Sequence, residues 1–353
     1  MTVASDGVAT RPRTPHLSVS VVICAYTLHR WAMLEAAVES VLAQTPPAAE
    51  VMVIVDHCPD LALRARAAFD GRTVQVLESD GPPGLSGARN CGTRAARGDV
   101  VAFLDDDAEA TAGWLAAHVA RYADDVAVLA VGGHIEPVWE SGEPRWFPAT
   151  FRWVVGCSYE GQPVAAAPVR NPIGANMSFR RDVLTAVGGF AVPLGRVGAN
   201  PRGGEETELS IRAVRLFPDE HVMLDPDAVV RHWVPEQRST WSYFVRRCWA
   251  EGRSKADLRR MLVSAEPLGT ERSYVRDTLR RAAVAGLADA FGRRDVGPLL
   301  QSAAILVGLS VTVGGYVRGA AAAELRHLRP MLRSTRVRVS PTLASPLRAR
   351  ERR

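Results

Sequence analysis

Two acidic clusters contain the residue types that could do chemistry in this chain. Asp105–Asp107 directly follow the apolar run Val100–Leu104, and Gly203–Glu208 opens a segment with helical spacing. Adjacent carboxylates repel one another, and a buried carboxylate is costly unless it is paired or bound to a metal. Carboxylate oxygens suit hard divalent cations such as Mg²⁺ or Mn²⁺, which often also hold substrate phosphates. The first cluster therefore predicts a metal site with a diphosphate ligand.

Both clusters also have a purely structural interpretation. Asp107 could cap a helix through Ala112–Tyr122, because aspartate is favoured at helix N-termini. Glutamates in the first turn of a helix that starts at Glu205 could simply complement its dipole. The residues alone leave these alternatives open.

The elements that must position the first cluster form a regular alternation. Helical spacing, with apolar residues three and four apart, separates short apolar strands. The predicted strands are Val19–Cys24, Val51–Val55, Val74–Leu77 and Val100–Leu104, and the predicted helices are Trp31–Gln44, Leu61–Phe69 and Gly84–Arg97. Further along the chain, helices are predicted over Glu205–Phe217 and from Trp241 to about Leu262. This alternation predicts an α/β domain with a mostly parallel sheet covered by helices on both faces. Ligands of such sheets gather beyond the carboxyl ends of the strands, which directs attention to Ala25–Thr27, Asp56–Asp60 and Asp105–Asp107.

Composition indicates a globular protein without a disulfide framework. The chain has 353 residues, of which 47% are hydrophobic and 23% are charged. Its five cysteines are scattered and form no C-x-x-C pair, which fits a reducing compartment. Residues 1–17 are polar with no apolar core of a signal peptide, so we expect a disordered leader and a cytoplasmic catalytic domain.

The C-terminal end differs from the rest in charge and hydropathy. From Arg318 onward there are ten arginines and two glutamates, so the net charge of +5 belongs to this end. No aromatic residue interleaves with these arginines, which argues against nucleic acid and leaves an anionic membrane surface as a partner. Residues 296–317 contain no charged residue. This segment could span a bilayer, dock on its surface or be buried as a soluble helix.

Five motifs in order resemble glycosyltransferase family 2, whose members have the GT-A fold. They are Val19–Thr27 (VSVVICAYT), Val53–His57 (VIVDH), Gly84–Gly92 (GLSGARNCG), Val101–Asp107 (VAFLDDD) and Gly203–Leu209 (GGEETEL). The resemblance covers about residues 18–260 and implies sugar transfer from a nucleoside-diphosphate donor. It also implies Mn²⁺ or Mg²⁺ as the cofactor, with a UDP-sugar favoured as the donor.

The resemblance implies roles for donor-site residues at the strand ends. Ala25 and Tyr26 would line the base, and Asp56 would contact base or ribose. Departing from the family pattern, His57-Cys58-Pro59 follows Asp56, which leaves the choice of nucleotide open. Arg89 and Asn90 would lie near the nucleotide, although a surface position on a helix is the alternative.

The remaining implied roles concern metal, base and acceptor. Asp105 and Asp106 would contact the nucleotide, and Asp105, Asp107 and His232 would hold the metal. Glu206 would be the general base of an inverting transfer, with Glu205 as the second choice. Asn176 would bind hydroxyls of the acceptor, unless it only holds a turn.

Two rival functions and a domain division complete the sequence-based hypothesis. A sugar nucleotidyltransferase would need a Gly-rich basic loop after the first strand, which Ala25–His29 does not supply; a non-catalytic nucleotide-sugar-binding protein stays possible. The processive Q-x-x-R-W motif is absent, which favours transfer of a single sugar to a hydroxyl of an unidentified acceptor. We expect a catalytic domain over 18–262, a helical region over 263–325 and a basic disordered tail over 326–353, all cytoplasmic or attached to the inner face of the cell membrane.

Overall fold

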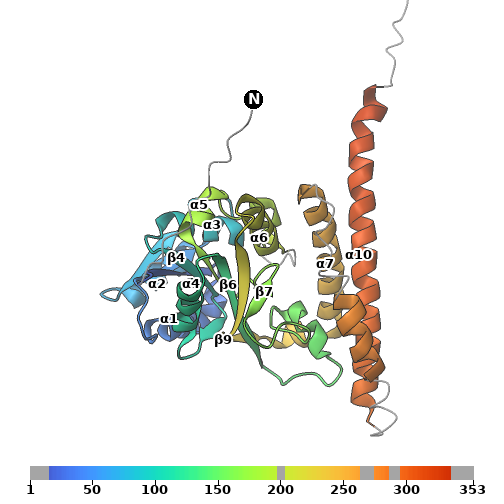
Figure 1. Cartoon of the computed structure of the whole chain (residues 1–353), viewed down its shortest axis with the longest axis horizontal. Coiled ribbons are helices and arrows are strands. Elements are labelled where there is room, and N and C mark those ends of the chain that lie inside the picture. The colour runs from blue at the N-terminus through green and yellow to red at the C-terminus, as the bar shows by residue number, and fades with distance from the viewer. Residues whose placement is uncertain (1–15, 197–202, 263–273, 286–294, 335–353) are drawn as a thin grey trace, which may run out of the picture.

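A nine-stranded mixed sheet forms the centre of the larger, α/β part of the chain, which we call the sheet domain (Figure 1). The computed structural model describes residues 16–196, 203–262, 274–285 and 295–334. The strand order is β3-β2-β1-β4-β8-β6-β9-β5, with β7 paired to β9. The strands are β1 (Val19–Ala25), β2 (Glu50–Val55), β3 (Val74–Glu78), β4 (Val100–Asp105), β5 (Ala108–Ala110), β6 (Val128–Trp139), β7 (Ala167–Val169), β8 (Asn176–Arg180) and β9 (His221–Val234).

The first four strands are parallel to one another, as the sequence predicts, and the other half of the sheet is mixed. β8 is antiparallel to both β4 and β6, while β9 is parallel to β6 and antiparallel to β5 and β7. The sheet-domain helices are α1 (Trp31–Leu42), α2 (Pro59–Phe69), α3 (Leu85–Ala95), α4 (Trp114–Asp124), α5 (Arg181–Ala186), α6 (Glu205–Leu216) and the short η2 (Ala149–Val155). The predicted strands and helices of residues 19–105 all form, with ends that shift by one or two residues.

Alternate residues of each strand pack into two separate hydrophobic cores, one on each face of the sheet. Val21 and Ile23 of β1 pack in a cluster with α1, α2 and α4, whereas Val22 packs in a second cluster with α3 and α5. Strands buried on both faces read as continuous apolar runs, which explains the valine-rich sequences. Covering both faces leaves the carboxyl ends of the parallel strands as the edge where polar side chains collect.

Two long helices stand beside the sheet domain (Figure 1). α7 (Trp241–Leu262) has the predicted ends, and α10 (Val296–Ser334) packs along it, with the short η5 (Tyr274–Leu279) between them in the chain. The helices approach closely at glycines: a Cβ on Gly252 would lie 2.0 Å from the carbonyl oxygen of Thr312, and one on Gly315 would lie 2.3 Å from that of Trp249. Small residues permit such contact between helix backbones.

The C-terminal boundary corrects one expectation. α10 continues to Ser334, so residues 326–334 are helical rather than part of a disordered tail. The predicted leader and the rest of the predicted tail lie outside the described residues, except for residues 16 and 17. Among the described residues, Val296–Ala322 is the one helical stretch long and apolar enough to cross a membrane.

Candidate active site

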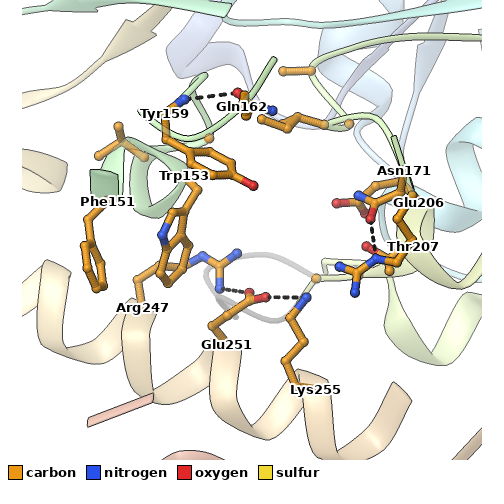
Figure 2. Close-up of a pocket in the computed structure, with 18 of the residues that line it drawn as sticks. Phe151, Trp153, Tyr159, Gln162, Asn171, Glu206, Thr207, Arg247, Glu251 and Lys255 are labelled. Atoms are coloured by element: carbon orange, nitrogen blue, oxygen red, sulfur yellow. Dashed lines mark hydrogen bonds and ion pairs between the residues drawn. The ribbon is translucent and has the colours of Figure 1, made fainter. Parts of the chain in front are cut away.

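A cavity of about 610 Å³ lies where the sheet domain meets the C-terminal helices (Figure 2). We refer to it as the central cavity. One wall contains the predicted site residues Arg89, Asp105, Glu205, Glu206 and His232. The opposite wall comes from η2, α7, η5 and the inner face of α10. The second wall belongs to no motif in the sequence.

The acidic run after β4 lies next to His232 because of strand pairing. β5 pairs with β9 so that Ala108 faces His232, and the amide of Trp233 donates to the carbonyl oxygen of Asp107. The Asp107 Oδ1 and His232 Nε2 atoms are 3.3 Å apart. A short strand therefore follows the aspartates, and α4 begins only at Trp114 with Gly113 as its N-cap. The alternative that Asp107 caps this helix is wrong.

Asp105, Asp107 and His232 form a cluster with the donor atoms of a divalent cation site. One ligand atom from each residue lies within 4.8 Å of the others. Two carboxylates and an imidazole suit Mn²⁺, and carboxylates suit Mg²⁺. The residues present therefore fit the metal that the sequence predicts.

Positively charged side chains surround the Asp107 carboxylate. Arg30 Nη1 is 3.0 Å and Arg238 Nη2 is 3.7 Å from its Oδ2. Burial alone would raise the pKa of Asp107, but His232 and Arg30 outweigh it and hold the pKa well below its usual range. For His232, burial alone would lower the pKa, because it disfavours the charged imidazolium. The Asp107 carboxylate outweighs this effect, and the pKa of His232 rises to about 10. An ion pair of this kind keeps Asp107 ionised.

Asp106 does not join this cluster. Its Oδ1 accepts from Arg30 Nη1 at 2.8 Å, and the side chain is buried outside the central cavity. Burial and the neighbouring Asp107 charge raise the pKa of Asp106 to about 7. Asp106 therefore anchors Arg30 beside Asp107, and its nucleotide contact stays a prediction.

Arg89 links the two acidic clusters. Its Nη2 donates to Asp105 Oδ1 at 3.1 Å and to the Gly174 carbonyl oxygen at 2.9 Å, while its Nη1 donates to Glu205 Oε1 at 2.9 Å. The side chain is 2% exposed, so the surface interpretation is wrong for this residue. Asn90 exchanges hydrogen bonds with the backbone of Phe190 and lies outside the central cavity, and its nucleotide contact stays a prediction.

The two adjacent glutamates at the start of α6 differ in environment. Glu205 is buried and paired with Arg89. The Glu206 carboxylate lines the central cavity (Figure 2). Its own backbone amide donates a hydrogen bond to it, and within the described part of the chain it forms no ion pair. Burial and the neighbouring Glu205 charge raise the pKa of Glu206 to about 7. A carboxylate that forms no ion pair and has a raised pKa suits proton abstraction near neutral pH.

The predicted nucleotide end lies at the carboxyl ends of β1 and β2. The Asp56 amide donates to the Ala25 carbonyl oxygen at 2.8 Å, so the two strand ends are adjacent. Asp56 Oδ2 accepts from the Gly84 amide, and its Oδ1 contacts His57 Nδ1, both at 2.8 Å. Tyr26 is exposed, with the Arg30 guanidinium 5.5 Å from its ring. Neither Tyr26 nor Asp56 lines the central cavity, so nucleotide and acceptor sites would be distinct.

Asn176 has a structural role, which corrects its predicted acceptor role. Its side chain is fully buried in β8. The Oδ1 atom accepts from Trp114 Nε1 at 2.8 Å and lies 3.0 Å from His118 Nε2. Its Nδ2 donates to the carbonyl oxygens of His134 and Ala228. All four hydrogen-bonding positions of the amide are used, which leaves none for a ligand.

Several site residues escaped the sequence analysis. Arg30 and Arg238 contact Asp107 from loops and short turns with no motif, and the α7 side chains reach the central cavity through helix packing. Only the helical spacing of α7 could have indicated that Arg247, Glu251 and Lys255 share one face.

Comparisons with known proteins agree with this geometry. The model of the family described as glycosyl transferase family 2 matches residues 20–188. The glucosyl-dolichyl phosphate glucuronosyltransferase of Haloferax volcanii is 33% identical over 304 residues, which cover 86% of this chain and 96% of that protein. The succinoglycan biosynthesis protein ExoM of Rhizobium meliloti is 28% identical over 56% of this chain and 58% of its own length.

A solved structure shows the same fold. The mannosyltransferase PcManGT from Pyrobaculum calidifontis, in complex with GDP-Man and Mn²⁺, superposes with a TM-score of 0.54 at 19% identity, over 89% of this chain and 90% of that one. Sheet topology and site together define the class as glycosyltransferases of the GT-A fold. The chain belongs to glycosyltransferase family 2.

Proposed function

We propose that this protein transfers a single sugar from a nucleoside-diphosphate donor to a hydroxyl of a phosphate-linked lipid acceptor, with inversion. The observation that supports it most is that Glu206 lines the same cavity as Asp105 and His232. These two residues belong to the Asp105/Asp107/His232 cluster, whose third member, Asp107, lies 3.3 Å from His232. The Haloferax volcanii relative, similar along nearly its whole length, is named for a glucosyl-dolichyl phosphate acceptor. The PcManGT structure, with GDP-Man and Mn²⁺, supports the choice of a nucleotide sugar and that metal as probes.

Asp105, Asp107 and His232 would hold Mn²⁺ or Mg²⁺. When bound, the ion would neutralise the negative charge that develops on the departing nucleoside diphosphate. Arg238, which already lies near Asp107, would add positive charge on the same side. Ala25, Tyr26 and Asp56 would bind base and ribose at the adjacent strand ends, and a UDP-sugar remains our expectation for the donor.

Glu206 would act as the general base. The acceptor oxygen attacks the anomeric carbon and its proton passes to Glu206, while the bond from that carbon to the diphosphate oxygen breaks. Glu205 cannot share this role easily, because Arg89 already uses one of its oxygens. A single displacement of this kind inverts the anomeric configuration.

The outward face of α10 would dock on a membrane. Most of its exposed side chains between Val296 and Val317 are apolar, while its inner face packs on α7 and lines the central cavity through Leu309 and Thr312. The exposed apolar residues of α10 are Val296, Leu299, Leu300, Leu306, Val307, Val313 and Val317. Arginines from Arg318 onward favour anionic lipids on the cytoplasmic side. We therefore place the enzyme at the inner face of the cell membrane.

A donor screen followed by transfer tests the enzymatic proposal. Nucleotide sugars should raise the melting temperature in the presence of Mn²⁺ and not in EDTA, because a ligand of the folded state stabilises it. The best donor should then yield product with a prenyl-phosphate glucoside. A chain that binds donor without any turnover would instead be a binding protein, and a chain that binds no nucleotide sugar would refute the proposal.

Sedimentation with liposomes tests the membrane proposal separately. The wild type should sediment with vesicles containing phosphatidylglycerol, and less so at high salt. Leu306→Glu on α10 should remain in the supernatant, whereas Leu63→Glu on the exposed face of α2 serves as a matched control and should sediment. Equal behaviour of the two variants would contradict the assignment of this face.

A further inference from the structure

The α7 wall of the central cavity presents a row of three charged side chains opposite Glu206. Arg247, Glu251 and Lys255 follow one another at four-residue intervals and all point into the cavity (Figure 2). Arg247 Nη1 is 2.9 Å from Glu251 Oε2, and Lys255 Nζ is 3.3 Å from Glu251 Oε1. Charged side chains at this spacing lie on one helix face.

The row has more positive than negative charge. Burial raises the pKa of Glu251, but Lys255 and Arg247 outweigh it and lower the pKa to about 2, so this carboxylate is ionised. Among the three side chains of the row, two cations therefore contact one carboxylate. Arg247 is 7% exposed, and its Nε–H has no hydrogen-bond partner in the described part of the chain. A buried donor without a partner costs free energy that an anionic ligand could recover.

The surfaces beside this row are aromatic and apolar. The Arg247 guanidinium lies 5.8 Å from the ring of Trp153, and Tyr159 and Tyr274 stack edge to face nearby. Leu279 and Leu309 continue the lining toward α10, whose other face exposes apolar side chains. An acceptor that combines an anionic group with an apolar chain would match both surfaces.

We infer that Arg247 and Lys255 form the subsite for the phosphate of a lipid-linked acceptor. This inference rests on the proposed function and adds the residues that recognise its acceptor. The phosphate would bind Arg247 and Lys255 in competition with Glu251, and the reacting hydroxyl would lie across the cavity at Glu206. The donor diphosphate would lie elsewhere, at the Asp105/Asp107/His232 cluster.

Calorimetric titration of the full-length protein with farnesyl phosphate tests the subsite. Lys255→Met should weaken binding about tenfold or more, because a charge-assisted contact is lost. Glu251→Gln should strengthen binding, because it removes the competing carboxylate. A general structural disturbance would weaken farnesyl phosphate binding in both variants. It would not strengthen binding in one variant and weaken it in the other. Arg253→Met, on the exposed side of the same helix, is the matched control and should change nothing.

Further titrations identify the source of the phosphate and separate the two proposals. Inorganic phosphate should bind far more weakly than farnesyl phosphate, and farnesol should respond to none of the variants. UDP with Mn²⁺ should bind all variants like the wild type. Loss of UDP binding in Lys255→Met, equal affinity for both phosphates, or unchanged farnesyl phosphate affinity in both variants would overturn the subsite. Absence of UDP binding in the wild type would instead count against the proposed function.

Discussion

The two walls of the central cavity hold charge in different ways. Behind the strand-end wall, which Asp105, His232 and Arg238 line, Asp107 lies within 4 Å of His232, Arg30 and Arg238. On the α7 wall, Arg247 and Lys255 both contact Glu251, and the Nε–H of Arg247 has no hydrogen-bond partner among the described residues. The first group contains the carboxylate and imidazole donor atoms of a cation site, and the second presents two cations to the cavity. This difference is the basis of our proposal that metal and donor bind on one side of the cavity and an anionic acceptor on the other.

The largest expected effect comes from removing the candidate base, which lies on the same wall as Asp105 and His232. Glu206→Gln keeps the shape of the side chain but cannot accept the proton. Turnover should fall by about 10²–10⁴-fold, as is typical for loss of general-base catalysis. Titration of UDP with Mn²⁺ should give an unchanged affinity. Glu205→Gln is the companion variant. It should lower the melting temperature, because it weakens the pair with buried Arg89, and it should reduce turnover less than Glu206→Gln does. A Glu206→Gln enzyme with near-normal kcat would reverse the assignment.

Removing a metal ligand should weaken donor binding and leave the binding of an anionic acceptor unchanged. Asp107→Asn should weaken Mn²⁺-dependent UDP binding by about 100-fold or more, since even indirect partners of metal ligands contribute 10–100-fold. Calorimetry with and without EDTA measures this effect. Glu109→Gln, exposed two residues away, provides the control for a local change of charge. If Asp107→Asn bound UDP equally well with and without Mn²⁺ at wild-type affinity, the metal cluster would be misassigned.

The pH dependence of catalysis should report the Glu206 carboxyl. Its pKa is raised to about 7, so the basic form is lost as pH falls below that value. We expect kcat/KM to rise about tenfold per pH unit up to pH 7 and then to level off, as a single deprotonation requires. The residual activity of Glu206→Gln should lack this step. A step that persists in the variant would assign the titration to another group.

The smallest effect on activity is expected at Asn176. Asn176→Ala leaves the indole N–H of Trp114 and two carbonyl oxygens unpaired. The free energy of unfolding should fall by about 1–3 kcal/mol, the cost of leaving a buried polar group unsatisfied. KM for the acceptor should stay constant, because the amide does not face the central cavity. Denaturant titration and steady-state kinetics measure both quantities, and an unchanged stability with a raised KM would restore the acceptor role.

The sequence predicts the parallel half of the sheet and the strand-end wall for a physical reason. Short apolar strands ending in aspartates encode both the element and the position of its ligand groups, as Val100–Asp107 illustrates. The ends of α7 were also predicted, because its helical spacing begins and ends clearly. The parts that escaped prediction depend on contacts between distant segments. Asn176 looks like a ligand residue until β8 buries it, and Arg30 reaches Asp107 only through the folding of the loop after β1.

The α7 wall shows the same limit more strongly. Arg247, Glu251 and Lys255 are ordinary members of an arginine-rich helix in sequence, and the side of the helix that faces the cavity is set by its packing against α10 through Gly252 and Gly315. Helical spacing identifies residues that share a face, but it does not identify what that face contacts.

The stereochemistry of transfer tests the central claim most directly. This claim is that the Glu206 carboxylate, which lines the same wall of the cavity as Asp105 and His232, activates the acceptor for a single displacement. The product formed from a nucleoside-diphosphate α-sugar would be examined by NMR, with the anomeric configuration determined from its coupling constants. We predict a β-linked product, inverted relative to the donor. An α-linked product would contradict the single displacement and the role of Glu206, while leaving the fold and family unaffected.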